Sequence, residues 1–177
     1  KLSGLISQLF EYSKLEAAQI EPHKEAFQVG ELAQDVAHKF EVLAKEKDIS
    51  IELKVPESLP LIFADLGLVE RVLNNLMDNA LKFTPEGGKV SLEMAASDNS
   101  VEIKVADTGP GITEADQPHI FDRYKKAYRT GSGNSNHGAG LGLAIVKKIL
   151  ELHNQGIKVQ SKVKEGTAFV FQLPVLS

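Results

Sequence analysis

The segment from residue 71 to residue 85, R-V-L-N-N-L-M-D-N-A-L-K-F-T-P, constrains the fold more than any other part of the chain. Asn75, Asn79 and Lys82 are spaced i, i+4 and i+7, so a helix would carry them on one polar face. About a quarter turn away lies an apolar stripe that must pack against a core, formed by Val69, Val72, Leu73, Leu76, Ala80 and Phe83. The polar face is either simply solvated or, with two carboxamides and an ammonium group, suited to a metal–phosphate group.

Length and composition limit the class of protein. The chain has 177 residues, 42% of them hydrophobic and 25% charged, which is typical of one soluble globular domain with a short appendage. No apolar run approaches the roughly 20 residues that cross a bilayer, and the first residues have helical rather than secretory patterning. The absence of cysteine excludes disulfides and cysteine-ligated metals, and we expect a cytoplasmic location. A net charge of −4 argues against nucleic-acid binding.

Hydrophobic periodicity predicts helices and strands along the whole chain. Residues 1–19 form a helix that resembles the end of a longer one, and residues 21–25 form a linker. Further helices are predicted at 30–47, from a cap at Asp65 to about Phe83, and at 141–152. Strands are predicted at 26–29, 49–53, 61–63, 90–96, 101–106, 157–162 and 168–173, with Gly166 and Thr167 in a turn before the last strand. This order favours an α/β (α+β) fold, a two-layer sandwich of a mixed, mostly antiparallel sheet packed on helices.

Two glycine-rich segments could contact a nucleotide. In D-T-G-P-G-I (residues 107–112) the glycines permit close approach, so Asp107 either accepts a hydrogen bond from an amine such as that of adenine or merely closes an Asx turn. G-A-G-L-G-L (residues 138–143) opens a predicted helix, whose exposed N–H groups either favour phosphate or form an ordinary cap. Leu143 stands where the dinucleotide fingerprint requires its third glycine, and no P-loop is present.

Residues 122–140 are polar, basic and rich in glycine and serine, without hydrophobic periodicity. A stretch of this length inside a compact domain is often functional. Arg123, Lys125, Lys126 and Arg129 would attract an anion to it, or they simply form a solvated basic loop.

Together and in this order, these segments resemble the catalytic, ATP-binding domain of sensor histidine kinases. That family shares a superfamily with the ATPase domains of gyrase, a heat-shock chaperone and MutL. N-L-M-D-N-A-L-K-F-T-P resembles the family's N box, D-T-G-P-G-I its first glycine box and I-F-D-R-Y (residues 120–124) its F box. G-A-G-L-G-L-A-I-V resembles the second glycine box and G-T-A-F (residues 166–169) the third. The resemblance covers roughly residues 26–174 and implies a Bergerat-type ATP-binding fold over residues 26–177.

The resemblance implies roles in binding Mg²⁺ and ATP. Asn79 would coordinate Mg²⁺, Asn75 would lie beside the metal, and Lys82 would contact phosphate. Asp107 would bind the adenine amine, and Phe83, which replaces the family's usual tyrosine, would pack on the purine. The remaining nucleotide-binding residues lie in the three glycine boxes and are Gly109, Gly111, Gly138, Gly140, Leu141, Gly142 and Thr167.

Residues 122–140 would form the ATP lid, and here the chain departs from the family. Many relatives place an aromatic residue and then an arginine where this chain has Lys125 and Lys126. Lysine keeps the positive charge but cannot form the bidentate hydrogen bonds of a guanidinium group. We therefore expect Lys126 to contact the γ-phosphate, with Arg123 or Arg129 as alternatives.

A kinase is favoured over an ATPase because Asn75 stands where ATP-hydrolysing relatives carry a glutamate base. The expected activity is transfer of the γ-phosphate of Mg-ATP to a histidine on a helical hairpin, then onward to a response regulator receiver domain. None of the chain's histidines has the acceptor motif, so residues 1–20 would be the end of a hairpin otherwise missing from this chain. The parent protein would be a homodimer, with anchoring in the inner membrane as one option for it, and this fragment would be a monomer. Two alternatives stay open, a nucleotide-binding regulatory module without transfer activity and a gyrase-like ATPase.

Overall fold

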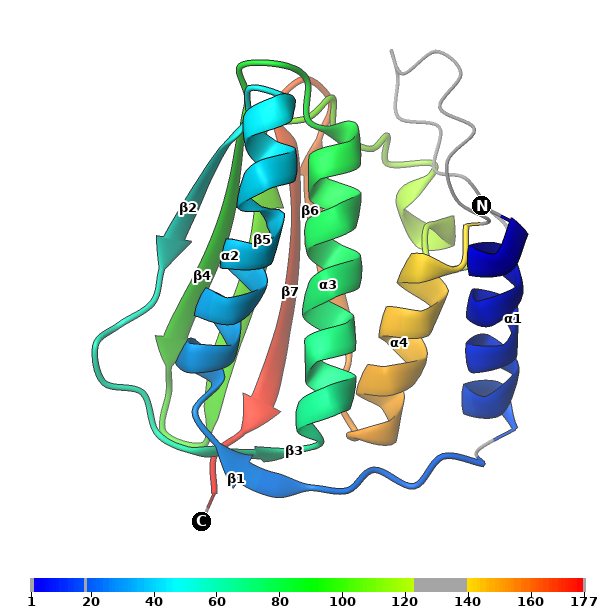
Figure 1. Cartoon of the computed structure of the whole chain (residues 1–177), viewed down its shortest axis with the longest axis vertical. Helices are drawn as coiled ribbons and strands as arrows, with labels where there is room; N and C mark the ends of the chain where they lie inside the picture. The colour runs from blue at the N-terminus through cyan, green and yellow to red at the C-terminus, as the bar shows by residue number, and fades with distance from the viewer. Residues whose placement is uncertain (1, 18, 123–139, 177) are drawn as a thin grey trace.

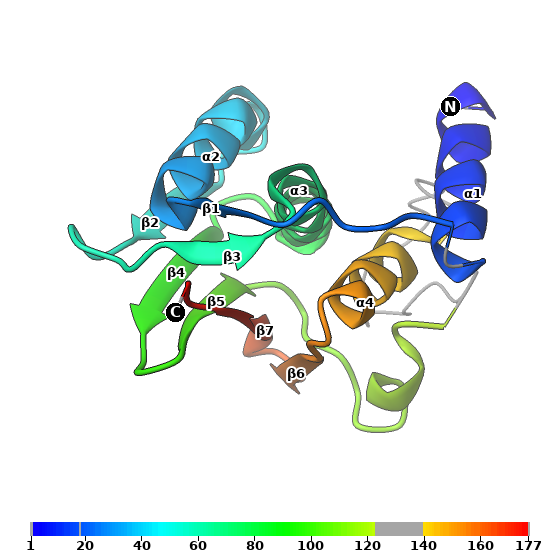
Figure 2. The same cartoon turned by 90° about the horizontal axis from the view of Figure 1, so that it is seen from below.

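The computed structural model describes residues 2–17, 19–122 and 140–176 (Figure 1). Three helices, α2 (Val29–Glu46), α3 (Leu66–Phe83) and α4 (Gly142–Leu152), cover one face of a sheet. Helix α1 (Leu2–Glu16) lies beside α4, away from the sheet (Figure 2). A short 3₁₀ helix, Gln117–His119, follows the glycine turn after the central strands. The predicted two-layer sandwich is confirmed.

Within the described residues, five strands form the main sheet in the order β2-β4-β5-β7-β6. Their bounds are β2 (Ser50–Lys54), β4 (Lys89–Ala96), β5 (Ser100–Asp107), β6 (Ile157–Lys162) and β7 (Gly166–Pro174). β2 runs parallel to β4 and the other pairs are antiparallel, so the sheet is mixed as predicted. A second, two-stranded sheet pairs β1 (Glu25–Phe27) with β3 (Ile62–Ala64) across one end of the helical layer.

Helix α3 is the central element of the helical layer. Its N-cap is Asp65, whose Oδ1 accepts a hydrogen bond from the backbone N of Leu68 at 3.0 Å, as the sequence predicts. It ends at Phe83, where Thr84 turns to extended backbone before Pro85. Its apolar stripe is buried between the sheet and the neighbouring helices and consists of Val69, Val72, Leu73, Leu76, Met77, Ala80 and Leu81.

Strand β7 begins two residues earlier than the sequence suggested, so the prediction that Gly166 and Thr167 form the preceding turn is wrong. Gly166 pairs with Lys162 and Thr167 with Ser161 in the antiparallel β6–β7 ladder. The turn is instead made by residues 163–165, with Lys164 at φ +70°. Turn composition suggested glycine in the bend, but Gly166 is needed in the strand because a backbone carbonyl approaches it closely.

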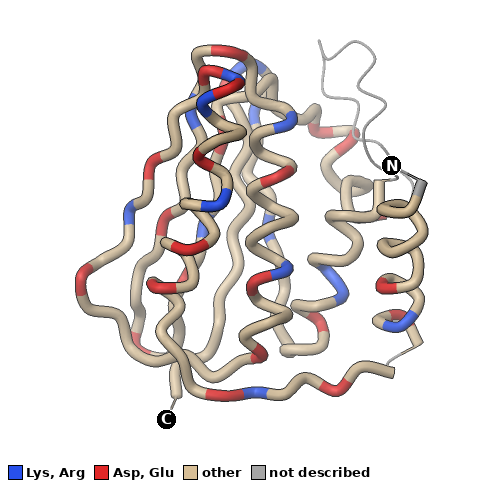
Figure 3. Tube along the Cα trace, viewed as in Figure 1, with Lys and Arg blue, Asp and Glu red and all other residues tan. Residues whose placement is uncertain are grey.

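Charged side chains line the sheet face that the helices leave uncovered. The carboxylate oxygens of Glu52 lie 3.0 Å from the Nζ of Lys89 and 3.5 Å from the Nζ of Lys54. The Nζ of Lys54 also lies 3.1 Å from a carboxylate oxygen of Glu93. In the described part of the chain, acidic and basic residues are interspersed rather than gathered by sign (Figure 3). The hydrogen bond and the charge of Lys89, and then the charge of Lys54, hold the pKa of Glu52 below its usual range.

This arrangement predicts a pH-dependent contribution of Glu52 to stability. Because folding lowers its pKa, the stabilisation is present above the unfolded-state pKa, about 4.3, and is lost as the pH falls through the folded-state pKa. Glu52→Gln should therefore lower the melting temperature slightly at neutral pH, and the difference from wild type should vanish in acid. Thermal unfolding across this pH range measures it. Glu102→Gln, on the same face and without an ion pair among the described residues, is the control, and a pH-independent difference for Glu52→Gln would contradict the prediction.

Candidate functional site

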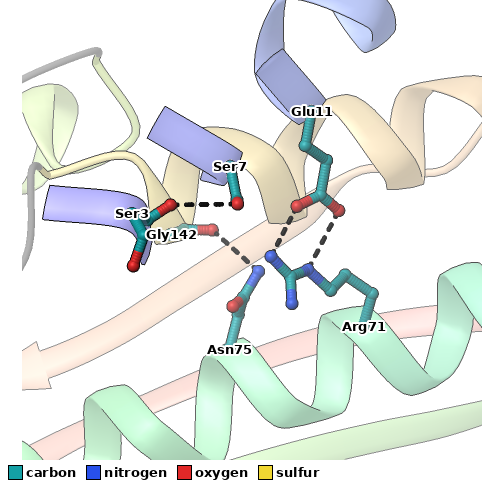
Figure 4. Close-up of polar contacts among 6 residues, drawn as sticks. All are labelled: Ser3, Ser7, Glu11, Arg71, Asn75 and Gly142. Carbon is teal, nitrogen blue, oxygen red and sulfur yellow. Dashed lines mark hydrogen bonds and ion pairs between the residues drawn. The ribbon is translucent and has the colours of Figure 1, made fainter. Parts of the chain in front are cut away.

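Asn75 and Gly142, which lie far apart in the sequence, meet where α3 faces the start of α4. The Nδ2 of Asn75 donates to the carbonyl oxygen of Gly142 at 3.5 Å (Figure 4). A long bond of this kind is weak and leaves the amide free to reorient. Two residues predicted for the site are therefore brought together by the packing of α3 on α4.

Asn79 lies one turn further along α3 and is the least satisfied polar side chain of the site. Its Nδ2 is buried and has no hydrogen-bond partner among the described residues. Leaving a buried amide unpaired costs about 1–3 kcal/mol, so such groups usually await a ligand or water. A half-turn of the amide would present its oxygen instead, and an amide oxygen can bind a hard cation such as Mg²⁺. The residue fits a metal or a metal-bound water.

Asp107 ends β5 with its carboxylate buried at 6% exposure. Its Oδ1 accepts a hydrogen bond from the backbone N of Gly109 at 2.9 Å, so the Asx turn considered from the sequence is formed. A Cβ at Gly109 would lie 2.9 Å from both this oxygen and the carbonyl oxygen of Phe83. Glycine therefore lets the carboxylate approach the last residue of α3, and the Asx turn does not exclude a binding role.

The third glycine segment packs directly against the backbone of Asp107. A Cβ at Gly166, which has φ +108°, would lie 2.0 Å from the carbonyl oxygen of Asp107. Thr167 pairs with Asp107 across the β5–β7 ladder and is buried. Its hydroxyl lies 2.8 Å from that of Ser161. The Thr167 hydroxyl thus contacts Ser161, and the Thr167 backbone lies beside Asp107, the residue predicted to bind adenine.

Ser161 is a residue that the sequence did not single out. Its Oγ accepts from the backbone N of Ile112 at 2.7 Å and donates to the carbonyl of Gly166 at 3.0 Å, which joins the first and third glycine segments. Gly111 serves the same junction, since a Cβ there would lie 2.1 Å from the carbonyl oxygen of Lys162. Nothing in the local sequence distinguishes Ser161 from any other serine in a strand.

Lys82 and Phe83 form the last turn of α3, both half-buried, with the Lys82 ammonium 5.7 Å from the centre of the Phe83 ring. On the facing helix, Leu141 is the N-cap residue of α4 and is buried. A Cβ at Gly142 would meet no described atom within 4 Å, and Gly140 has φ +71°. Helix α4 also begins without a side-chain cap. Its first N–H groups therefore suit an anion.

Several predicted residues lie outside the described part of the chain. These are Arg123, Lys125, Lys126, Arg129 and Gly138, in the segment predicted to be a lid. Within the described ranges, no three His, Cys, Asp or Glu side chains cluster as metal ligands. None of the described helices has the length and apolarity that a membrane span needs.

Helix α1 is tied to α3 one turn before Asn75. The Nε of Arg71 donates to Oε1 of Glu11 at 2.9 Å, and a second guanidinium nitrogen pairs with Oε2 (Figure 4). Tyr12 and Leu15 of α1 are buried, and a cleft of about 240 Å³ between α1 and α4 has Tyr12, Glu16, Lys147 and Lys148 in its lining. None of the predicted site residues that the structure describes lines this cleft. The ion pair therefore connects α1 to the helix that carries the site.

Comparison with known proteins gives consistent matches. Residues 64–177 match the family described as histidine kinase-, DNA gyrase B-, and HSP90-like ATPase. The adaptive-response sensory kinase SasA of Microcystis aeruginosa is 34% identical over 175 residues, covering 98% of this chain and 45% of the relative. The SasA of Rippkaea orientalis is also 34% identical, with 98% and 44% covered. The chain thus spans less than half the length of these curated relatives.

Solved structures agree with the sequence relatives. Full-length ShkA, crystallised in complex with AMPPNP, superposes with a TM-score of 0.88 at 32% identity, covering 99% of this chain and 36% of that one. The histidine kinase ThkA in complex with the response regulator protein TrrA has a TM-score of 0.79 at 26% identity, with 99% and 47% covered. Both matches extend over α1 as well as the sandwich.

The bidentate contact between Glu11 and Arg71 predicts a measurable energetic coupling. Because both side chains are partly shielded from solvent, at 24% and 38% exposure, we expect about 1 kcal/mol, the upper end for surface pairs. Urea unfolding of Glu11→Gln, Arg71→Gln and the double variant measures it as a double-mutant cycle. The exposed pair Lys162–Glu165, at 3.9 Å, should show coupling near zero as a control. Strictly additive losses at Glu11 and Arg71 would contradict the prediction.

Proposed function

Since this chain belongs to the histidine kinase-, DNA gyrase B- and HSP90-like ATPases, and is the ATPase domain of a histidine kinase, we propose that it binds Mg-ATP for transfer of the γ-phosphate to a histidine. The observation that carries the proposal is the buried Nδ2 of Asn79, which has no hydrogen-bond partner in the described part of the chain and lies between the Asn75–Gly142 contact and the last turn of α3. A polar group left unsatisfied at this point fits a metal–phosphate ligand better than an empty protein surface.

Three residues of α3 would hold the metal–phosphate end. Asn79 would bind Mg²⁺, Asn75 would lie beside the ion, and Lys82 would contact a phosphate oxygen. When bound, Mg²⁺ would neutralise phosphate charge and orient the transferring group. The uncapped start of α4, reached through Gly140 and Gly142, would add backbone N–H donors to the anion. The lid residues Lys126, Arg123 and Gly138 keep their proposed roles at the triphosphate.

Asp107, Phe83 and Gly109 would recognise the base. A buried carboxylate is a strong acceptor for the adenine amine, and the half-buried Phe83 ring can pack on the purine. Gly109 would leave room for the base beside Asp107 and Phe83. Gly111, Leu141 and Thr167 would form parts of the pocket wall. The Asx turn supports this role, because it holds the carboxylate in one orientation.

Asn75 favours transfer over hydrolysis. Its amide neither gains nor loses a proton near neutral pH, so it cannot serve as the general base that typically contributes about 10²–10⁴-fold. In this structure the amide instead donates to the Gly142 carbonyl, which supports a role in positioning. The curated relatives in the comparison are named as sensory kinases, in agreement with this choice over a gyrase-like ATPase.

We also propose a domain organisation and partners for the whole protein. Residues 1–20 would be the end of the helical hairpin that bears the acceptor histidine, residues 21–25 a linker, and residues 26–177 the catalytic domain. Helix α1 supports this, because it exposes an apolar face that a longer hairpin or a second copy would cover, formed by Leu5, Ile6, Leu9 and Phe10. A response regulator is the proposed next acceptor, since ThkA was solved with one.

The base assignment predicts that Asp107→Asn weakens binding of a non-hydrolysable ATP analogue at least about tenfold, because a charged acceptor is lost. The asparagine oxygen can still accept from Gly109, so the turn should survive. Isothermal titration calorimetry with Mg²⁺ measures the affinity. Asp98→Asn, in the exposed β4–β5 turn, is the control. Unchanged affinity in Asp107→Asn would remove Asp107 from the adenine site.

The metal assignment predicts that Asn79→Ala makes analogue binding largely independent of Mg²⁺. The same titrations, repeated with and without Mg²⁺, give the ratio of affinities, which should be large for wild type and close to one for the variant. Asn74→Ala is a matched control, because the amide of Asn74 lies on the same helix but contacts Lys39 of α2 instead of facing the proposed site. A variant with the wild-type ratio would show that Asn79 does not contribute to metal binding.

A further inference from the structure

The last turn of α3 has carbonyl groups that the helix itself cannot satisfy. The carbonyl of Ala80 accepts two hydrogen bonds from Thr84, one from its backbone N at 3.0 Å and one from its hydroxyl at 2.7 Å. The carbonyl of Leu81 accepts from the ammonium group of Lys47, which lies 34 residues earlier in the chain. Lys47 is thus a cap supplied to this helix end by another element.

Lys47 is well placed to hold this turn. It is the C-cap residue of α2 and is half-buried. A cation at a helix C-terminus meets the negative end of the helix dipole, and a charged donor makes a stronger hydrogen bond than a neutral one. The cap therefore joins charge complementarity to satisfaction of an otherwise unpaired carbonyl.

The residues after Lys47 hold the segment that follows α3. The carbonyl of Asp48 accepts from the backbone N of Gly87 at 2.8 Å, and the backbone N of Ser50 donates to the carbonyl of Gly88 at 3.1 Å. From the side of the sheet, Gly109 lies against the carbonyl of Phe83. The end of α3 is therefore held between the α2–β2 turn and the glycine turn after β5.

We propose that Lys47 is a positioning residue of the nucleotide site, acting through the backbone of Leu81. The next two residues are Lys82 and Phe83, so the carbonyl that Lys47 holds belongs to the turn that presents both side chains. This inference rests on the proposed function, because it matters only if those side chains contact nucleotide. The cap holds the turn in one conformation before the ligand arrives, which lowers the entropy lost on binding.

The test compares three variants by calorimetric titration with a non-hydrolysable ATP analogue and Mg²⁺, at a temperature where circular dichroism shows each to be folded. Lys47→Met keeps the length of the side chain but leaves the Leu81 carbonyl unpaired, and should weaken binding about five- to tenfold. Lys47→Arg keeps a charged donor and should restore affinity to within about twofold. Lys45→Met removes an exposed lysine from the same helix turn and should match wild type.

A second comparison separates positioning from a general loss of stability. In a Lys82→Ala or a Phe83→Ala background, Lys47→Met should cost less affinity than in wild type, because one of the groups it positions is gone. Three results would each overturn the inference: an equal loss of affinity in the wild-type and the variant backgrounds, a lack of rescue by Lys47→Arg, or wild-type affinity in Lys47→Met. Should Lys47→Met not fold, Lys47→Gln takes its place; its amide is a neutral donor on a shorter side chain, so a smaller loss of affinity is expected, and wild-type affinity would overturn the inference.

The outcomes distinguish this inference from the function on which it rests. If the wild-type chain binds the analogue and Lys47→Met binds equally well, the positioning role fails and the proposed function stands. If the wild-type chain itself does not bind, the proposed function fails and the role of Lys47 fails with it.

Discussion

Close approach of backbone to backbone around the end of β5 is the constraint on which the site depends. A side chain at Gly166 would lie 2.0 Å from the Asp107 carbonyl oxygen, and one at Gly111 would lie 2.1 Å from that of Lys162. At Gly109 it would lie 2.9 Å from the carbonyl oxygen of Phe83. Contacts this short exclude any Cβ, so these glycines let β5, the β6–β7 turn and the end of α3 meet. Their meeting surrounds the buried carboxylate of Asp107, and Ser161 joins the same segments by hydrogen bonds.

Helix α3 connects this region to the rest of the molecule because each of its sides has a different task. One side is buried in the core, and a second receives Lys39 and Lys47 from α2. The third presents Arg71 to α1 and Asn75 to the start of α4. A displacement of α1 would thus act on the same helix that carries the proposed metal and phosphate residues. The contacts of α3 thus connect α1 physically to the proposed nucleotide site.

Much of the fold follows from local patterns. The start of α3 at Asp65, its end at Phe83 and the β4–β5 hairpin depend on caps, periodicity and turn residues, all of which act within a few positions. The start of β7 was predicted wrongly because a glycine needed for close packing resembles a glycine needed for a bend. Ser161, Lys47 and the Glu11–Arg71 pair were not predicted, because each acts on a partner far away in the sequence, which for Ser161 is the backbone N of Ile112.

The sequence alone determined the order of elements, the two-layer architecture and the set of chemical groups that a nucleotide site would need. Those features are written in spacing and composition, which a single chain displays. The tertiary structure decided which groups meet: Asn75 with the Gly142 carbonyl, Asp107 with the end of α3, and Asn79 with no partner among the described residues. Such contacts arise from the packing of helices on a sheet, where one long-range approach changes hydrogen bonding and burial without any local signal.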